Sequence, residues 1–196
     1  LLAVVATLVF LRVESRVADP LLDLALLRRR EFAFMNTLNF FYGAGIFGLF
    51  SFMPLYAQSA YGMSSSESGA LLTPRALAMI GASSLGAMLL PVTGYRKPIV
   101  IGLVAMAGSL LLLSRGFHDV ELGPLLLPDF VWLSAVVALT GIGFGFSGPA
   151  ANNAAIELAP ERIAAITGLR GMFRSLGGAI GTAAIVLVVS HAESEG

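Results

Sequence analysis

Two groups of residues in this sequence have types and spacings that could carry chemistry. Gly143-x-Gly145-x-x-Gly148 has the pattern of a dinucleotide-binding loop, which requires a strand before it and a helix after it. Asn36 and Asn39 fall on one face of any helix that contains them, where their amides could hydrogen-bond a ligand. Which chemistry is possible depends on the elements that position these side chains.

The elements are constrained by how few charges the chain carries. Of 196 residues, 57% are hydrophobic and 12% are charged, whereas an ordinary soluble domain carries about 25% charged residues. A net charge of zero gives no basic surface for nucleic acid, and the absence of cysteine excludes disulfides and cysteine metal sites. We therefore interpret the chain as an integral membrane protein and expect it to hold no metal and no cofactor.

Long uncharged tracts indicate where the chain crosses the bilayer. A spanning helix needs about 20 apolar residues, whereas transmembrane strands alternate polar and apolar residues in runs of about ten. The tracts are too long and too uniformly apolar for strands. We predict an all-α protein with five complete spanning helices near residues 33–57, 69–91, 98–115, 130–152 and 165–190.

The remaining segments complete the expected organisation. Residues 1–11 are apolar but too short to cross, and we interpret them as the tail of a truncated transmembrane helix. We expect residues 12–31 to form a cytoplasmic linker, residues 32–190 the five-helix unit and residues 191–196 an external tail. The sequence is thus expected to be a fragment of a longer protein.

Basic residues in the connections predict the orientation. Basic residues gather in segments 12–31 and 93–98, and segment 157–164 holds Arg162, with Arg170 and Arg174 just beyond it. On the other side, segments 58–68 and 191–196 contain no lysine or arginine, and segment 115–128 has only Arg115. Because cytoplasmic connections carry the excess of basic residues, we place the first group of segments in the cytoplasm. The expected location is the inner (plasma) membrane, with several passes.

In this setting the glycine pattern is better explained by helix packing. The apolar run that contains it is continuous, so no strand is expected to end before it. Small residues let helix backbones approach each other in lipid, where no hydrophobic force draws helices together. The pairs of this type are Gly141 and Gly145, Gly177 and Gly181, and Ala82 and Gly86.

Three stretches of the chain resemble a known family. GIGFGFSGPAANNAAIELAPERIAAITGLRGMFRSLGGAIGTAAI is similar to the late helices of the drug:proton antiporter-2 family of the major facilitator superfamily. FLRVESRVADPLLDLALLRRREF resembles that family's segment between its eighth and ninth spans, and PLYAQSAYGMSSSESGALLTPRAL resembles the end of the ninth span and the start of the tenth. The resemblance covers nearly the whole chain in the right order.

This resemblance implies a fold and an activity. It implies part of a major-facilitator-type helical bundle, in which residues 32–190 are the ninth to thirteenth of fourteen spans. It implies proton-coupled efflux of hydrophobic or cationic drugs by alternating access, with the lipid bilayer, a small-molecule substrate, protons and a missing amino-terminal half as partners. The superfamily's cytoplasmic turn motif is represented only by TGYRKP, which keeps Gly94, Arg96 and Lys97 but no acid.

Polar residues in the spans are the candidates for a substrate cavity. Asn36 and Asn39, with Tyr42 adjacent, could bind a substrate or bond to neighbouring helices. A charge at the position of Arg75 costs roughly 2.5–3.5 kcal/mol on insertion scales, so Arg75 should face the bundle interior, pair with a carboxylate of the missing half, or snorkel to the outer headgroups. Pro74 beside it could loosen the helix near a gate.

Two further asparagines, Asn152 and Asn153, follow Gly148-Pro149, where we expect a helix break. The freed carbonyls and amides there could bind cargo or cap the break. Tyr56 and Gln58 are expected at the outer interface, where amphipathic rings are common.

Charged residues near the cytoplasmic ends are candidates for a gate. Arg170 and Arg174 are four residues apart and could pair with Glu157 or Glu161, although the positive-inside bias alone would also place them there. The gate candidates are Arg96, Lys97, Glu157, Arg170 and Arg174. Because no Asp or Glu lies in the middle of a span, the proton-coupling group is expected outside this chain.

The alternative to a transporter is a non-transporting membrane scaffold or accessory subunit. A membrane-embedded enzyme would need a nucleophile and base, or metal ligands, inside the spans, whereas His118 and His191 lie in an outer loop and the tail. A channel would need rings of charge or carbonyl groups, which the sequence does not indicate. We therefore expect no enzyme.

Overall fold

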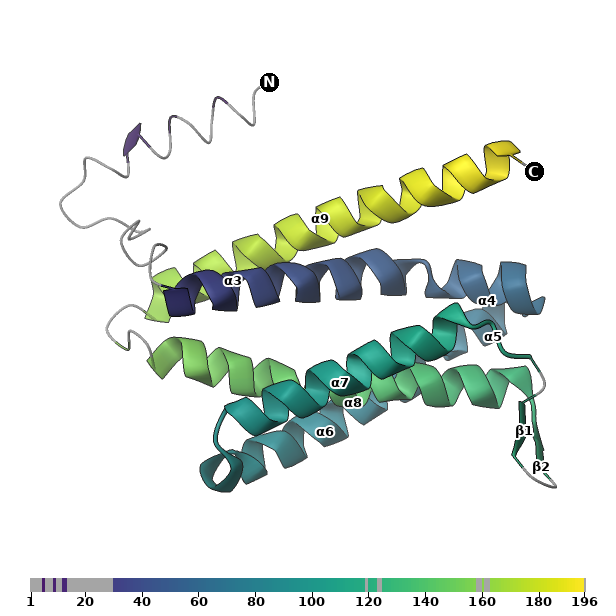
Figure 1. The fold of residues 1–196 in the computed structure, drawn as a ribbon, viewed down its shortest axis with the longest axis horizontal. Helices are drawn as coiled ribbons and strands as arrows, with labels where there is room; N and C mark the ends of the chain where they lie inside the picture. The colour runs from purple at the N-terminus through teal and green to yellow at the C-terminus, as the bar shows by residue number, and fades with distance from the viewer. Residues whose placement is uncertain are drawn as a thin grey trace. The chain divides into compact units, whose positions relative to one another are not determined.

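The chain is largely helical in a computed structural model. The structure describes residues 30–118, 120–122, 125–157, 160 and 163–195, together with Val5, Val9, Arg12 and Val13. The elements in chain order are α3 Arg30–Gly43, η1 Ala44–Leu49, α4 Met53–Tyr61, α5 Ser65–Ala70, α6 Leu72–Thr93, α7 Arg96–Ser114, β1 Val120–Leu122, β2 Leu125–Leu127, α8 Asp129–Glu157 and α9 Ile163–Glu195 (Figure 1). Most of the expected truncated helix and linker, as well as Glu161, lies outside the described residues.

Within the described part of the chain, four helical stretches are long and apolar enough to cross a membrane: Ser65–Thr93, Arg96–Ser114, Asp129–Glu157 and Ile163–His191. They correspond to four of the five expected spans and confirm a partial, all-α membrane bundle. Among the residues that the structure describes, a short antiparallel hairpin of β1 and β2, in which Val120 pairs with Leu127, departs from a purely helical description. Helix α9 continues to Glu195, past the expected end of its span.

The expected span 33–57 is not one uninterrupted α-helix. It is divided into α3, the π-helical segment η1 and α4. Pro54 lies in the first turn of α4 and has no N–H to continue a helix from the preceding turn. Glycines at 43, 45 and 48 lower the intrinsic helix stability of the middle of this stretch. The sequence pattern predicted the hydrophobic length correctly but not this interruption.

The chain divides into two packing units. The first contains α3, η1 and α9, and the second, Phe50–Ala154, contains α4 to α7 and most of α8. In the first unit α3 and α9 lie side by side (Figure 1). Their backbones approach closely at glycines: a methyl group on Gly177 would overlap the Phe40 carbonyl, and one on Gly181 would lie 2.8 Å from the Ala44 Cα.

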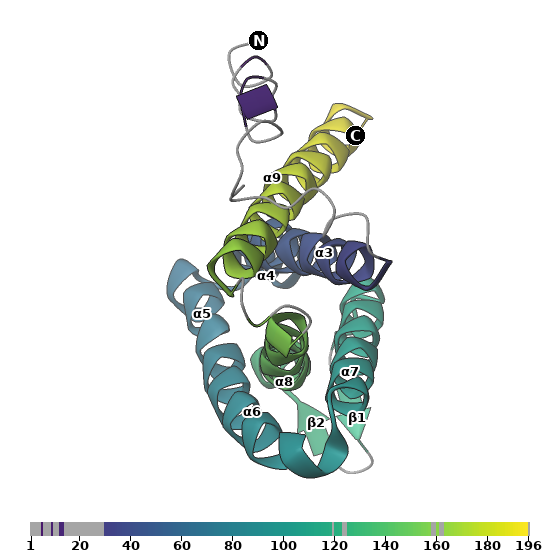
Figure 2. The same cartoon turned by 90° about the vertical axis from the view of Figure 1, so that its left-hand side faces the viewer.

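In the second unit, α8 packs against both α6 and α7 (Figure 2). Gly141 and Gly145 face α6, where a methyl group on Gly145 would lie 2.6 Å from the Met79 carbonyl oxygen. Gly143 faces α7 and meets Gly102 backbone to backbone. The Gly-x-Gly-x-x-Gly pattern therefore lies within a continuous helix, with helix rather than strand before it, and forms no dinucleotide-binding loop.

Polar and aromatic side chains fix the connection between α4 and α5 and the end of α7. Ser64 caps α5 in a capping box with Glu67. The hydroxyl of Tyr56 donates to the Leu113 carbonyl at 3.0 Å, and that of Tyr61 donates to the Phe117 carbonyl at 3.1 Å. Burial raises the pKa of the Tyr61 hydroxyl above its ordinary value, so this group remains a donor.

Candidate functional site

Helix α3 carries three polar side chains that are almost fully buried in an otherwise apolar segment. Asn36 is 2% exposed, and Asn39 and Tyr42 are each 3% exposed. The Asn39 Nδ2 donates to the Met35 carbonyl at 2.7 Å, which fixes the amide against its own helix. The amide oxygen and nitrogen of Asn36 are buried, and the described part of the chain offers neither of them a partner.

Arg170 of α9 completes this group. Its Nη2 donates to the Asn39 Oδ1 at 3.3 Å, and Tyr42 lies one turn beyond Asn39 on α3. The sequence assigned Asn39 to a substrate cavity and Arg170 to a gate; the structure brings the two together. We call Asn36, Asn39, Tyr42 and Arg170 the polar cluster.

The polar cluster offers hydrogen-bond donors and a positive charge but contains no acid. Neutral amides, a phenol and a guanidinium can bind acceptor groups, and a buried amide without a partner costs free energy until it finds one. The cluster can therefore recognise a polar ligand or water, whereas reversible protonation at neutral pH would require a different group.

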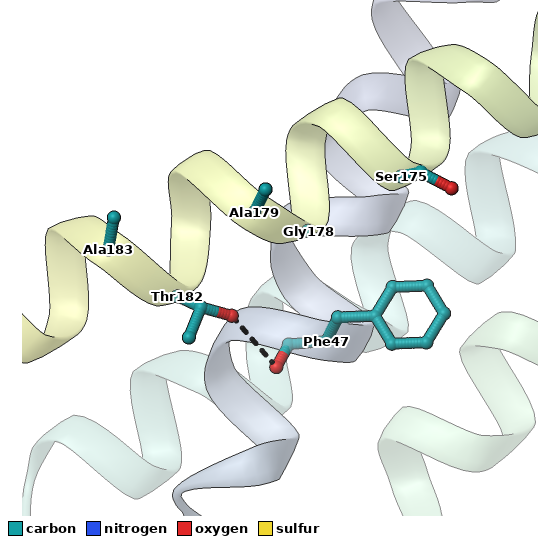
Figure 3. Close-up of a pocket in the computed structure, with 6 residues that line it drawn as sticks. All are labelled: Phe47, Ser175, Gly178, Ala179, Thr182 and Ala183. Atoms are coloured by element: carbon teal, nitrogen blue, oxygen red, sulfur yellow. Dashed lines mark hydrogen bonds between the residues drawn. The ribbon is translucent and has the colours of Figure 1, made fainter. Parts of the chain in front are cut away.

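A groove of about 490 Å³ lies beside η1 in the same unit. Its lining is mostly small residues of α9 with one aromatic ring, as Figure 3 shows: Phe47, Ser175, Gly178, Ala179, Thr182 and Ala183. The Thr182 hydroxyl donates to the carbonyl of Phe47, a residue of the π-helical segment, at a distance of 3.3 Å (Figure 3). The groove thus combines apolar surface, a ring and two hydroxyls, as ligand sites commonly do.

Arg75, in the first turn of α6, lies in the second unit. Its guanidinium carbon is 4.0 Å from the centroid of the Phe50 ring, and its backbone carbonyl packs against Gly141. Pro74 also lies in this first turn, where a missing N–H is tolerated. The interruption between α5 and α6 at Leu71 lies three residues before Pro74, and a gating role for Pro74 stays a prediction.

The predicted helix break at Gly148-Pro149 is wrong. Helix α8 continues through Pro149 to Glu157, with Asn152 half-buried and Asn153 exposed. One missing N–H costs less than unwinding a helix whose preceding turns are packed at Gly141, Gly143 and Gly145. No carbonyls are therefore freed by a break beside the two amides.

The gate candidates lie at helix ends. Arg96 and Lys97 begin α7 and are exposed, after a turn in which Gly94 has a φ of 65°. Glu157 is the last residue of α8 and is exposed. Arg174 is also exposed, and its backbone abuts Gly43. A gating role for these residues stays a prediction.

The sequence interpretation missed three features of these sites: the contact of Arg170 with Asn39, the ring of Phe50 under Arg75, and the π-helical segment. The glycine spacing gave no signal for the last, because Gly43-x-Gly45-x-x-Gly48 has the same spacing as Gly143-x-Gly145-x-x-Gly148, which lies in the continuous helix α8. The two contacts join residues far apart in the sequence and carry no local signal.

A set of apolar, membrane-length helices with polar groups buried among them defines a polytopic membrane protein rather than a simple anchor. Residues 1–182 match the Major Facilitator Superfamily, and the chain belongs to this family. The match confirms the expected superfamily. Because the family is one of membrane transporters acting on small molecules, it also confirms that the chain is not an enzyme.

Relatives of the chain include several resistance proteins. The chain is 34% identical to the multidrug transporter protein MdtP of Bacillus subtilis, in an alignment covering 92% of the chain and 32% of that protein. It is 32% identical to the puromycin resistance protein pur8 of Streptomyces alboniger, covering 97% and 37% respectively. For the tetracycline resistance determinant of Streptomyces rimosus the identity is 28%, covering 92% and 51%. The chain thus spans about a third to a half of the length of these relatives.

Proposed function

We propose that the chain is the carboxy-terminal part of a drug exporter of the drug:proton antiporter-2 type in the inner (plasma) membrane. It exchanges protons for hydrophobic or cationic compounds by alternating access, and a separate amino-terminal half supplies the proton-coupling carboxylate. The names of the three relatives, which refer to multidrug transport and to resistance against puromycin and tetracycline, support a drug substrate.

The polar cluster is the observation that carries this proposal. A buried amide without a partner, such as that of Asn36, is costly unless something occupies it during the working cycle. In a transporter whose two halves move around a central site, a substrate group fills that place during the cycle. The aromatic and hydroxyl-bearing groove beside η1 supplies apolar contact surface in the same unit.

Asn36 and Asn39 together provide a sharp test. Asn36→Leu removes an amide that has no partner in the described part of the chain, so the full-length transporter should remain as stable as the wild type or become more stable, while efflux falls. Asn39→Leu removes the bonds to Met35 and Arg170, so both stability and efflux should fall.

The measurements are ethidium accumulation in cells that express the full-length protein and thermal unfolding of the purified protein. Wild-type efflux should disappear when a protonophore collapses the proton gradient, and exposed Arg115→Met serves as a matched control. Efflux that survives without the gradient contradicts antiport. Absence of efflux in a well-folded full-length protein favours the scaffold alternative.

A further inference from the structure

Arg75 is a charged residue near the start of a membrane-length helix, and its head group is held in place. The guanidinium carbon lies 4.0 Å from the centre of the Phe50 ring, and Phe50 is itself 5% exposed. The Arg75 Nε is buried, and the described residues provide it with no hydrogen-bond acceptor. A snorkelling arginine would extend this group to the headgroups, whereas here it lies on an aromatic face.

The backbone of Arg75 is also fixed. Its carbonyl packs so closely against Gly141 that a methyl group there would overlap it. A cation fixed at both its backbone and its head group loses little conformational freedom when it binds an anion. The position is therefore pre-organised for binding.

The charge of Arg75 has no counter-ion within the described part of the chain. The nearest acid in sequence before it, Glu67, is already engaged, since its Oε2 accepts from the Ser64 backbone N–H at 2.9 Å and from the Ser64 hydroxyl at 2.7 Å. A guanidinium in a membrane segment is costly unless an anion or water meets it.

A second unpartnered group lies on the helix that packs against Arg75. Ser134 precedes Gly141 by about two turns of α8, which places both residues on the same face of that helix. The Ser134 hydroxyl is buried and finds no partner among the described residues. Helices α6 and α8 run parallel at this contact, because Arg75 meets Gly141 and Met79 meets Gly145. Arginine side chains on helices lean toward the helix amino terminus, which on α8 is the Ser134 end of the contact.

We propose that Arg75, held on Phe50, is a binding site for a carboxylate. With one face on the ring, the guanidinium keeps its in-plane N–H groups available, and these match the two oxygens of a carboxylate. The carboxylate belongs either to a zwitterionic substrate, which carries a cationic group as well, or to another part of the transporter. The first source rests on the proposed function, and the second does not.

The test measures thermal unfolding of the purified full-length protein with benzoate or with benzamide, its uncharged analogue. It compares wild type with Arg75→Met, which keeps an apolar stem, and with Arg75→Lys, which keeps the charge. Arg115→Met, at an exposed arginine, is the control. The assay requires no transport, so failure of the proposed function would not obscure its result.

If the carboxylate belongs to a substrate, benzoate should raise the unfolding temperature of the wild type saturably, and benzamide should not. Benzoate should bind at least tenfold more weakly to Arg75→Met, and Arg75→Lys should retain part of the wild-type affinity. If the carboxylate belongs to the transporter itself, benzoate should have no effect, and the unfolding temperature of Arg75→Met should be lower than that of Arg75→Lys. The proposal is overturned if benzoate has no effect and Arg75→Met is as stable as Arg75→Lys or more stable. Stabilisation by inorganic phosphate but not by benzoate also overturns it, because the site then binds a phosphate group rather than a carboxylate.

Discussion

Gly145 offers the most direct test of how α8 packs against α6. In Gly145→Ala, the new methyl group would lie 2.6 Å from the Met79 carbonyl oxygen, 2.7 Å from the Ala82 Cβ and 2.8 Å from the Ser83 nitrogen. Favourable contacts between carbon atoms lie at about 3.5–4.0 Å, so α6 must move away by on the order of 1 Å. All three contacts involve backbone or a Cβ atom, which cannot rotate out of the way.

The expected magnitude follows from two opposing effects. Overpacking costs about 1–3 kcal/mol, and the higher helix propensity of alanine returns up to about 1 kcal/mol. We therefore expect the free energy of unfolding of the full-length protein in mixed micelles to fall by about 1–2 kcal/mol.

Gly148→Ala is the matched control on the same helix. Its methyl group would make an ordinary contact, 3.8 Å from the Phe144 ring, so this variant should be as stable as the wild type or slightly more stable. If Gly145→Ala and Gly148→Ala had equal unfolding free energies, the close approach of α6 and α8 would be refuted.

Three further predictions use the same unfolding assay. Gly177→Ala should destabilise the contact between α3 and α9 by about 1–3 kcal/mol, whereas Gly171→Ala, with nothing within 4 Å of its methyl group, should not; equal effects would argue against that contact. Tyr56→Phe should cost about 0.5–1.5 kcal/mol because it removes the 3.0 Å bond to the Leu113 carbonyl, and an unchanged protein would show that this bond contributes nothing. Ser64→Ala should cost about 0.5–2 kcal/mol through loss of the α5 cap, while exposed Ser65→Ala should be nearly neutral.

The helices were predictable because the bilayer imposes a simple rule on the sequence. A membrane segment must be long, apolar and helical, and four of the five expected spans satisfy this rule in the structure. The spacing of Gly141 and Gly145 follows equally directly, since residues four apart lie on one helix face. In the structure both residues face α6.

The interruptions were harder to predict because local signals there compete with packing. Pro149 leaves α8 continuous, whereas the stretch around Gly43, Gly45 and Gly48 becomes partly π-helical. Both stretches contain glycine, and only one contains a proline in its middle. Whether such residues interrupt a helix depends on what packs against them, which one sequence does not show.

The sites were only partly predictable for a related reason. A polar residue in an apolar span is conspicuous, so Asn36, Asn39 and Arg75 could be selected from the sequence. Their partners could not be selected in the same way. Phe50 resembles other aromatic residues of its span, and Arg170 satisfied the positive-inside pattern, so neither was associated with its contact in the fold.

The account depends most on the threading of these helices through a bilayer, and the two ends of α7 test it most directly. Because this chain contains no cysteine, His118→Cys and Lys97→Cys can be introduced singly into the full-length protein once cysteines elsewhere have been removed. A membrane-impermeant maleimide should label position 118 in intact cells and position 97 only after the membrane is opened. Labelling of both positions from the same side, or of position 97 alone in intact cells, would contradict the account.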